Sequence, residues 1–187
     1  MICRWMLFLG ISSMTKFTDY LYDLIQNSIN AGSKNITLTI KHNGLLRVTI
    51  EDDGKGMDEA TLMKVKTFSY SSRKTRTVGL GLSLIHDLTI QTNGYFEITS
   101  KIGVGTTLSL GFDHQHIDFP AFGDIPSLIA DLYIHQEVSN FIFIYDDLKI
   151  DFEALGLNQL NKTFKQRNAL YKYVTDKLIE VANENTR

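Results

Sequence analysis

The chain has 187 residues, and 19 Lys and Arg against 21 Asp and Glu leave a net charge of −2, so no overall basic field exists to hold nucleic acid. Hydrophobic residues make up 43% of the chain and charged residues 21%, which is typical of a folded globular domain and argues against disorder. The single cysteine, Cys3, excludes an internal disulfide framework and a Cys-rich zinc site. At about 100–200 residues per domain, this length predicts one domain, or one domain with a small appendage.

Residues 1–13 are predicted to be an N-terminal extension. They carry one cation and an apolar stretch that is short for a secretory signal and shorter than the roughly 20 residues that span a bilayer. Met14 opens a more ordinary cytosolic beginning. A secretory signal is the alternative; we expect a cytoplasmic protein without a membrane span.

The order of the expected elements predicts an α/β sandwich. Apolar residues at spacings of three and four indicate a first helix over 17–31, and alternating residues on either side of Asn43-Gly44 indicate a β-hairpin. After these we expect helices over 58–68 and 79–92, a loop over 69–78, and strands over 95–100 and 106–112. Adjacent strand pairs between helices favour a two-layer arrangement, in which a mixed, mostly antiparallel sheet carries its helices on one face.

Residues 113–187 are expected to form a small C-terminal α/β extension whose role the sequence does not reveal. Asp124 and Pro126 indicate the beginning of a helix over 124–136. The further elements expected here are a hairpin of 141–145 with 148–152, and a polar-faced helix over 158–182. His114, His116 and Asp118 form an H-x-H-x-D run that would point to one side of an extended chain, so it is either a metal cluster or a solvated strand exit.

The first helix carries a polar stripe opposite its apolar face. Asp23, Asn27 and Asn30 lie four and three residues apart, which places them on one side of the helix. Asp and Asn are poor residues in the middle of a helix, because they compete for backbone hydrogen bonds. A carboxylate and two amides in a row could hold a hydrated Mg²⁺; the alternative is a solvated helix face.

Two glycine-rich segments suggest a bound ligand. Asp52-Asp-Gly-Lys-Gly56-Met57 directly follows a strand, where its glycines allow close approach to a ligand and its acidic residue can accept from an exocyclic amine. Further on, five cations precede Gly79-Leu-Gly81-Leu82 at the beginning of the next helix. Exposed amides at a helix N-terminus favour an anion, and cations just upstream can reach phosphates. Alone, each segment could also be an ordinary turn or a solvated loop.

The conjunction of the motifs decides between these interpretations. In order, the chain carries Asp23-Leu-Ile-Gln-Asn27-Ser-Ile-Asn30-Ala-Gly32, Asp52-Asp-Gly-Lys-Gly56-Met57, Gly79-Leu-Gly81-Leu82 and Gly103-Val-Gly105-Thr106-Thr107. Together they resemble the GHKL ATP-binding domain of histidine kinases, type II topoisomerases, mismatch-repair ATPases and heat-shock chaperones. Thr67-Phe-Ser-Tyr-Ser-Ser-Arg-Lys74 resembles the histidine-kinase branch most. The resemblance implies an ATP-binding domain over residues 14–112 with that family's two-layer fold.

The resemblance also implies a site for ATP or ADP with Mg²⁺. Asn27 is similar to the N-box residue that binds the Mg²⁺ bridging the phosphates. Asp52 is similar to the carboxylate that accepts a hydrogen bond from the adenine amino group. Gly54 and Gly56 would let the backbone pass the base.

Two further boxes complete the implied site. Residues 73–81 resemble the ATP lid, with Gly79 and Gly81 offering amides to the phosphates. Thr107 resembles the residue that supports the adenine pocket, and Thr106 beside it is a less favoured contributor. The implied nucleotide contacts are Asn27, Asp52, Gly54, Gly56, Met57, Arg73, Lys74, Gly79, Leu80, Gly81, Leu82 and Thr107.

Three residues depart from the family's pattern. Asp23 stands where hydrolytic members carry a glutamate that orients water, so a base here has one methylene less reach. Thr77 replaces one glycine of the lid, and Asn30 occupies a position that is aspartate in several hydrolytic relatives. About sixteen residues, none of them histidine, precede the first helix, so we expect no self-phosphorylating sensor kinase.

Two functions from different classes stay open. The first is an enzyme, with Asp23 as its base, that transfers a phosphoryl group to a partner protein, as anti-sigma-factor kinases do, or slowly hydrolyses ATP. The second is a non-catalytic nucleotide sensor whose lid orders on ATP and regulates a partner. The partner's identity is open, a homodimer is not excluded, and a fold that binds no nucleotide is the weakest option.

Overall fold

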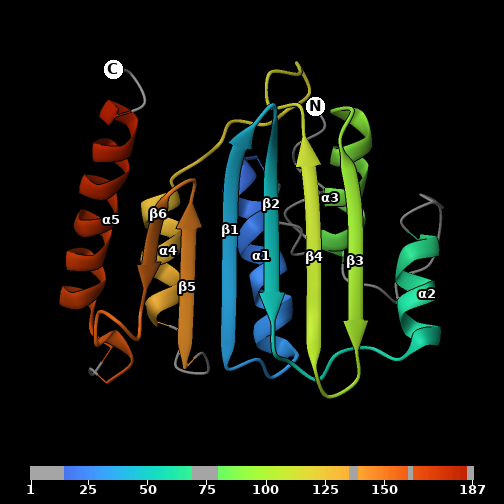
Figure 1. The fold of residues 1–187 in the computed structure, drawn as a ribbon, viewed down its shortest axis with the longest axis horizontal. Helices are drawn as coiled ribbons and strands as arrows, with labels where there is room; N and C mark the ends of the chain where they lie inside the picture. The colour runs from blue at the N-terminus through green and yellow to red at the C-terminus, as the bar shows by residue number, and fades with distance from the viewer. Residues whose placement is uncertain (1–14, 69–79, 135–138, 160–161, 185–187) are drawn as a thin grey trace, which may run out of the picture.

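One six-stranded sheet runs through the protein in a computed structural model that describes residues 15–68, 80–134, 139–159 and 162–184. The strands are β1 (Asn35–Asn43), β2 (Leu45–Asp52), β3 (Tyr95–Lys101), β4 (Gly105–Phe112), β5 (Asn140–Tyr145) and β6 (Leu148–Asp151). Their order across the sheet is β3-β4-β2-β1-β5-β6 (Figure 1). Neighbouring strands are antiparallel except β1 and β5, which are parallel, so the prediction of a mixed, mostly antiparallel sheet is confirmed.

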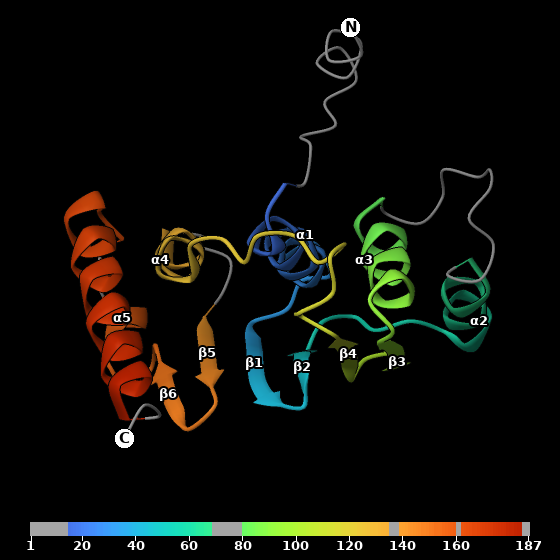
Figure 2. The ribbon, with the colours of Figure 1, turned by 90° about the horizontal axis from the view of Figure 1, so that it is seen from above.

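The helices cover one side of this sheet. They are α1 (Phe17–Asn30), α2 (Glu59–Phe68), α3 (Leu80–Gln91), α4 (Ile125–Ile134) and α5 (Phe164–Glu184), with a short 3₁₀ helix at Leu157–Gln159. Figure 2 shows α1, α3 and α4 in one layer above the strands, while α2 and α5 stand at the two edges. The two-layer arrangement expected from the sequence is therefore confirmed.

The core lies between the sheet and the helix layer. In β1 and β2, alternate side chains are buried toward the helices, as Leu38 and Ile40 are in β1 and Val48 and Ile50 in β2. Burying one such side chain contributes about 1.5–3 kcal/mol. This strict alternation also decides which polar residues at the strand ends face the helix layer.

The C-terminal part extends the same sheet. A crossover containing α4 brings β5 beside β1, with Asn35 opposite Asn140 and Ile40 opposite Tyr145. The phenyl rings of Phe141 and Phe143 are fully buried in the core that α1 also helps to form. The boundary proposed at residue 112 therefore falls within one continuous sheet.

Helix α5 begins six residues later than the sequence pattern suggested. The backbone amide of Gln166 donates to Thr163 Oγ1 (3.3 Å), and the Thr163 amide donates back to Gln166 Oε1 (3.0 Å). This reciprocal pair is a capping box, which satisfies amides that have no partner within the first turn. The apolar spacing alone did not reveal that beginning.

Candidate functional site

The polar stripe of α1 faces the region where α3 begins. In the part of the chain that the structure describes, the Asn27 side-chain Nδ2 is buried and has no hydrogen-bond partner. A buried amide without a partner costs free energy unless a ligand or water satisfies it. Asn30 is exposed, so of the two amides only Asn27 is placed for a buried ligand.

The Asp23 carboxylate, on the same stripe, packs directly against Gly81. A Cβ added at Gly81 would collide with the Asp23 Oδ2 and Cγ atoms. Gly81 is buried in the first turn of α3, where unbonded helix amides favour negative charge. With the Asp23 side chain in this position, only a glycine fits here between α1 and α3.

The Asp52 carboxylate lies at the end of β2 and is held by α1 and the loops around it. Its Oδ2 accepts from the Ser28 hydroxyl (2.8 Å), and its Oδ1 accepts from the Ser33 hydroxyl (3.1 Å) and the Gly54 amide (2.9 Å). An ionised carboxylate has about four lone-pair sites, so three donors leave about one acceptor site for a ligand. The arrangement therefore presents an oriented acceptor.

Asp53, the next residue, has a different role. Its carboxylate accepts from the Lys34 amide (2.7 Å) and from the backbone amide (2.9 Å) and side chain (2.6 Å) of Asn35. Burial raises the pKa of Asp53, but the hydrogen bonds from Asn35 and Lys34 outweigh it, and the pKa lies below its ordinary value. Asp53 fixes the beginning of β1, whereas Asp52 keeps an acceptor for the site.

The two glycines of this loop are needed for contacts within the protein. A Cβ on Gly54 would meet Ser33 Oγ at 2.6 Å and Ala31 Cβ at 2.9 Å, and one on Gly56 would collide with the Lys101 carbonyl. Gly56 also has a φ of +65°, which side chains rarely adopt. The loop therefore packs tightly on α1 and on the β3–β4 turn, and the expectation that these glycines also let the backbone pass a base stays a prediction.

The last box places Thr106, rather than Thr107, beside Asp52. The Met57 amide donates to Ser100 Oγ (2.9 Å), and this hydroxyl lies 2.9 Å from Thr106 Oγ1. Thr106 is opposite Asp52 in the β2–β4 pair and alternates with Leu108 toward the helices. Thr107 therefore points to the opposite face of the sheet, away from Asp52. The resemblance favours Thr107 over Thr106 as the residue that supports the adenine pocket, but it is Thr106 that lies beside Asp52.

Part of the expected lid falls outside the described residues. Arg73, Lys74 and Gly79 lie there. Of the residues that follow, Leu80 begins α3, Gly81 is buried against Asp23, and Leu82 packs partly buried on the core. The glycine-led helix lies where its pattern predicts.

The H-x-H-x-D run does not form an extended strand. Residues 113–118 form successive turns, in which His116 Nδ1 accepts from the Asp118 amide (3.2 Å), while the His114 ring packs edge-on against His42 (5.8 Å between ring centroids). Among the described residues, no group of three His, Cys, Asp or Glu side chains could hold a metal ion. The metal-cluster alternative is therefore wrong, because His116 and Asp118 lie close to each other (3.6 Å from Nδ1 to Oδ2) while His114 packs against His42 instead.

Two serines of the site were not recognised as functional in the sequence. Ser28 and Ser33 are 6% and 1% exposed, and both donate to Asp52. Ser28 lies among the apolar residues of α1, and a single serine in such a pattern is ordinarily interpreted as a small residue of the core. The signal that could have found it is a buried hydroxyl, directly after Asn27, on a helix that faces the Asp52 strand end.

None of the described helices combines the length and the apolar content that crossing a bilayer requires. This finding agrees with the absence of a long apolar run in the sequence.

Comparison with known proteins identifies the family. Residues 15–116 match the model of the histidine kinase-, DNA gyrase B- and HSP90-like ATPases. The chain is 30% identical over 95 residues to a probable C4-dicarboxylate sensor kinase of Halalkalibacterium halodurans, and 30% identical over 98 residues to the sensor histidine kinase ZraS of Escherichia coli. The matches cover 47% and 51% of this chain but only 18% and 21% of those kinases.

A shorter match concerns the DNA mismatch repair protein MutL of a Thermoanaerobacter strain, 54% identical over 37 residues, which are 20% of this chain and 6% of that protein. Among solved structures, the MutL ATPase domain of Aquifex aeolicus complexed with ADP aligns with a TM-score of 0.49 and 17% identity, covering 85% of this chain and 69% of that one. Because the family model matches more than half of the chain, this protein belongs to the histidine kinase-, DNA gyrase B- and HSP90-like ATPases, the GHKL family of ATP-binding domains.

Proposed function

We propose that this chain binds ATP, or ADP, with Mg²⁺ between α1, the end of β2 and the beginning of α3. The observation that carries the proposal is the Asp52 carboxylate, which three donors orient and leave with about one acceptor site. On the helix that supplies one of these donors, the buried Asn27 Nδ2 has no hydrogen-bond partner among the described residues. An acceptor of this kind suits the amino group of adenine. The buried amide on α1 suits the polar end of the same ligand.

The remaining residues of the site have complementary roles in this proposal. Asn27 would hold Mg²⁺ through its amide oxygen, which is the type of ligand that Mg²⁺ prefers. Bound there, Mg²⁺ would neutralise charge on the phosphates. Met57 and Thr106 would border the base, while Arg73, Lys74 and the amides of residues 79–82 would meet the phosphates.

The chemistry that we propose is phosphoryl transfer to a partner protein or slow ATP hydrolysis. Asp23 is the candidate base, and its carboxylate lies on the same helix face as Asn27, one turn away. Such reactions depend mainly on positioning and on charge neutralisation at the phosphates. The sensor kinases with similar domains support a signalling role in a larger assembly.

One contact favours a second function, a nucleotide-gated switch. The Asp23 carboxylate is packed against Gly81, the residue where the lid joins α3. A movement of the lid that shifts Gly81 would therefore also shift the Asp23 carboxylate. A carboxylate packed against the helix in this way is less free to reach a water molecule and act as a base. In this alternative, ATP orders the lid and exposes or hides a partner surface without turnover.

The first experiment measures nucleotide binding. Titration calorimetry with ATP and Mg²⁺ compares the natural protein with Asp52→Asn, which removes the acceptor charge. Asp53→Asn is the matched control, because it makes the same charge change one residue away, on a carboxylate that bonds to Lys34 and Asn35. We expect ATP affinity to fall at least about tenfold in Asp52→Asn only. Equal affinity in all three proteins would refute the proposed site.

A second experiment separates the enzyme from the switch. With γ-labelled ATP, released phosphate and label retained on protein are followed in the natural protein and in Asp23→Asn. Turnover that disappears in Asp23→Asn supports the enzyme with Asp23 as its base. ATP binding without phosphate or labelled protein supports the switch or a kinase that needs its partner.

A further inference from the structure

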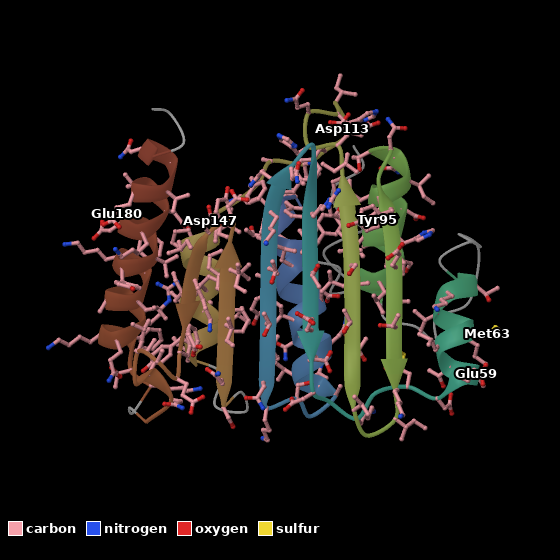
Figure 3. The ribbon with its side chains drawn as sticks, viewed as in Figure 1. Glu59, Met63, Tyr95, Asp113, Asp147 and Glu180 are labelled. Atoms are coloured by element: carbon pink, nitrogen blue, oxygen red, sulfur yellow. The ribbon has the colours of Figure 1, made fainter. Side chains whose placement is uncertain are left out.

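A cavity lies at the opposite end of the sheet from the Asp52 site. It has a volume of about 410 Å³ and lies between the β1 end, the loop before α4, the β5–β6 turn and the C-terminal part of α5. His42, which lines it, pairs with Leu46, whereas Asp52 pairs with Ile36. Six residues along a strand span about 20 Å, so the two sites are separate. Figure 3 shows Asp147, at the tip of the β5–β6 hairpin, at this end of the molecule.

The cavity has an aromatic wall and an apolar wall. The His42 ring is at the centre of the first, with ring centroids 5.2 Å from Tyr145 and 6.4 Å from Phe122. Leu178 and Val181 of α5 contribute to the other side. A volume of this size is in the range of sites for small organic molecules, which are mostly apolar with a few placed polar groups.

The placed polar group is the Asp146 carboxylate. Its Oδ1 accepts from the His42 amide (2.8 Å) and its Oδ2 lies 3.2 Å from His42 Nδ1, while the Asp146 amide donates to the Ile40 carbonyl (2.9 Å). These bonds fix the carboxylate, whose side chain keeps 24% exposure, and leave about two of its four acceptor sites open. Asp146 also has a φ of +50°, a conformation that Asp and Asn tolerate better than most residues.

The charges of this cavity select the ligand class. Among the described residues, its lining contains one carboxylate, which lies 3.2 Å from His42 Nδ1, and no Lys or Arg. On α5, the Lys177 ammonium lies 2.6 Å from the Glu180 carboxylate, which compensates its charge. The faces of aromatic rings carry negative potential and attract organic cations. Carboxylate, aromatic faces and apolar side chains together are complementary to an ammonium group on an apolar body.

We propose that this cavity is a binding site for a small organic amine, whose ammonium group meets Asp146 and the aromatic wall and whose apolar part packs against α5. The site is independent of the proposed ATP site. The family model ends at residue 116 and therefore includes neither the β5–β6 turn nor the helix α5 that build this cavity.

Binding can be measured by ligand-observed NMR and calorimetry with benzylamine as the cation and benzyl alcohol as the neutral probe of similar shape. Asp146→Asn removes the charge and keeps a residue that tolerates positive φ. Asp147→Asn is the matched control, because this exposed neighbour makes the same charge change and does not line the cavity. We expect millimolar or tighter binding of benzylamine, about tenfold weaker in Asp146→Asn and unchanged in Asp147→Asn.

Ala182→Phe provides a second variant, which fills the cavity from α5 and should abolish binding of benzylamine while thermal denaturation shows a folded protein. The proposal is overturned if benzyl alcohol binds as well as benzylamine, if Asp147→Asn weakens binding as much as Asp146→Asn, or if no amine binds the folded protein at millimolar concentration.

Discussion

The Ser28→Ala variant tests whether the α1 hydroxyl orients the Asp52 carboxylate. Ser28 is 6% exposed and donates to Asp52 Oδ2 over 2.8 Å. A hydrogen bond to a charged group contributes about 1.5–3 kcal/mol to stability, and because Asp52 is half-buried we take the lower end, about 1.5 kcal/mol. At about 2–4 °C per kcal/mol for a chain of this size, Tm should fall by about 3–6 °C.

The same variant should weaken ATP binding, because Asp52 keeps only the donors Ser33 and Gly54 and loses the one from α1. We expect a loss of about tenfold by calorimetry, with Ser109→Ala as the control, since this serine of β4 alternates with Leu108 toward the other face of the sheet. A double-mutant cycle with Asp52→Asn isolates the pair. If Ser28→Ala weakens ATP binding equally with Asp52 and with Asn at position 52, the hydroxyl does not act through this carboxylate.

Three further variants test other contacts. Gly56→Ala places a Cβ against the Lys101 carbonyl at a residue with positive φ, so chemical denaturation should show the free energy of unfolding lowered by at least about 2 kcal/mol. A decrease of less than about 0.5 kcal/mol would contradict the tight packing of this loop. The pKa of Asp53 is lower in the folded than in the unfolded chain, so its contribution to stability is present above about pH 4 and is lost as pH falls through the lowered pKa. Urea unfolding should therefore show Asp53→Asn less stable than the natural protein at pH 6 and the difference shrinking below about pH 4; a constant difference would refute this linkage. Asn27→Ala removes a buried side-chain Nδ2 that has no partner among the described residues, so the free energy of unfolding should stay the same or rise by up to about 1 kcal/mol. Calorimetry should show Mg²⁺-dependent ATP binding weakened at least about tenfold. Unchanged ATP binding in Asn27→Ala would remove this residue from the site.

The sequence predicted the fold because its signals are local and agree with one another. The apolar spacing of α1, the alternation of β1 and β2 around Asn43-Gly44, and Asp124 before α4 each predicted an element close to its observed bounds. In α4, the Ser127 amide donates to Asp124 Oδ1 (3.0 Å), as the capping pattern implies. The family followed from four motifs in order, which accident rarely produces together.

The candidate site was predictable only in part. Asp52 and Asn27 could be named from their motifs, because these motifs are continuous in the chain. Ser33 and Ser100 could not be, because their partners are distant in sequence: Ser33 lies 19 residues before Asp52, and Ser100 lies 43 residues after Met57. Hydroxyl contacts of this kind leave no periodic or compositional signal.

What the sequence by itself determined was thus the elements and the sheet type, which depend on residues close together in the chain, and the family, which depends on four short continuous motifs in order. Only the tertiary structure decided which threonine meets Asp52, since a shift of one residue along β4 moves a side chain to the other face of the sheet. It alone also joined the C-terminal part to β1 and brought His42 to Asp146, 104 residues away, because pairing between distant strands depends on the packing of the whole core rather than on any local pattern.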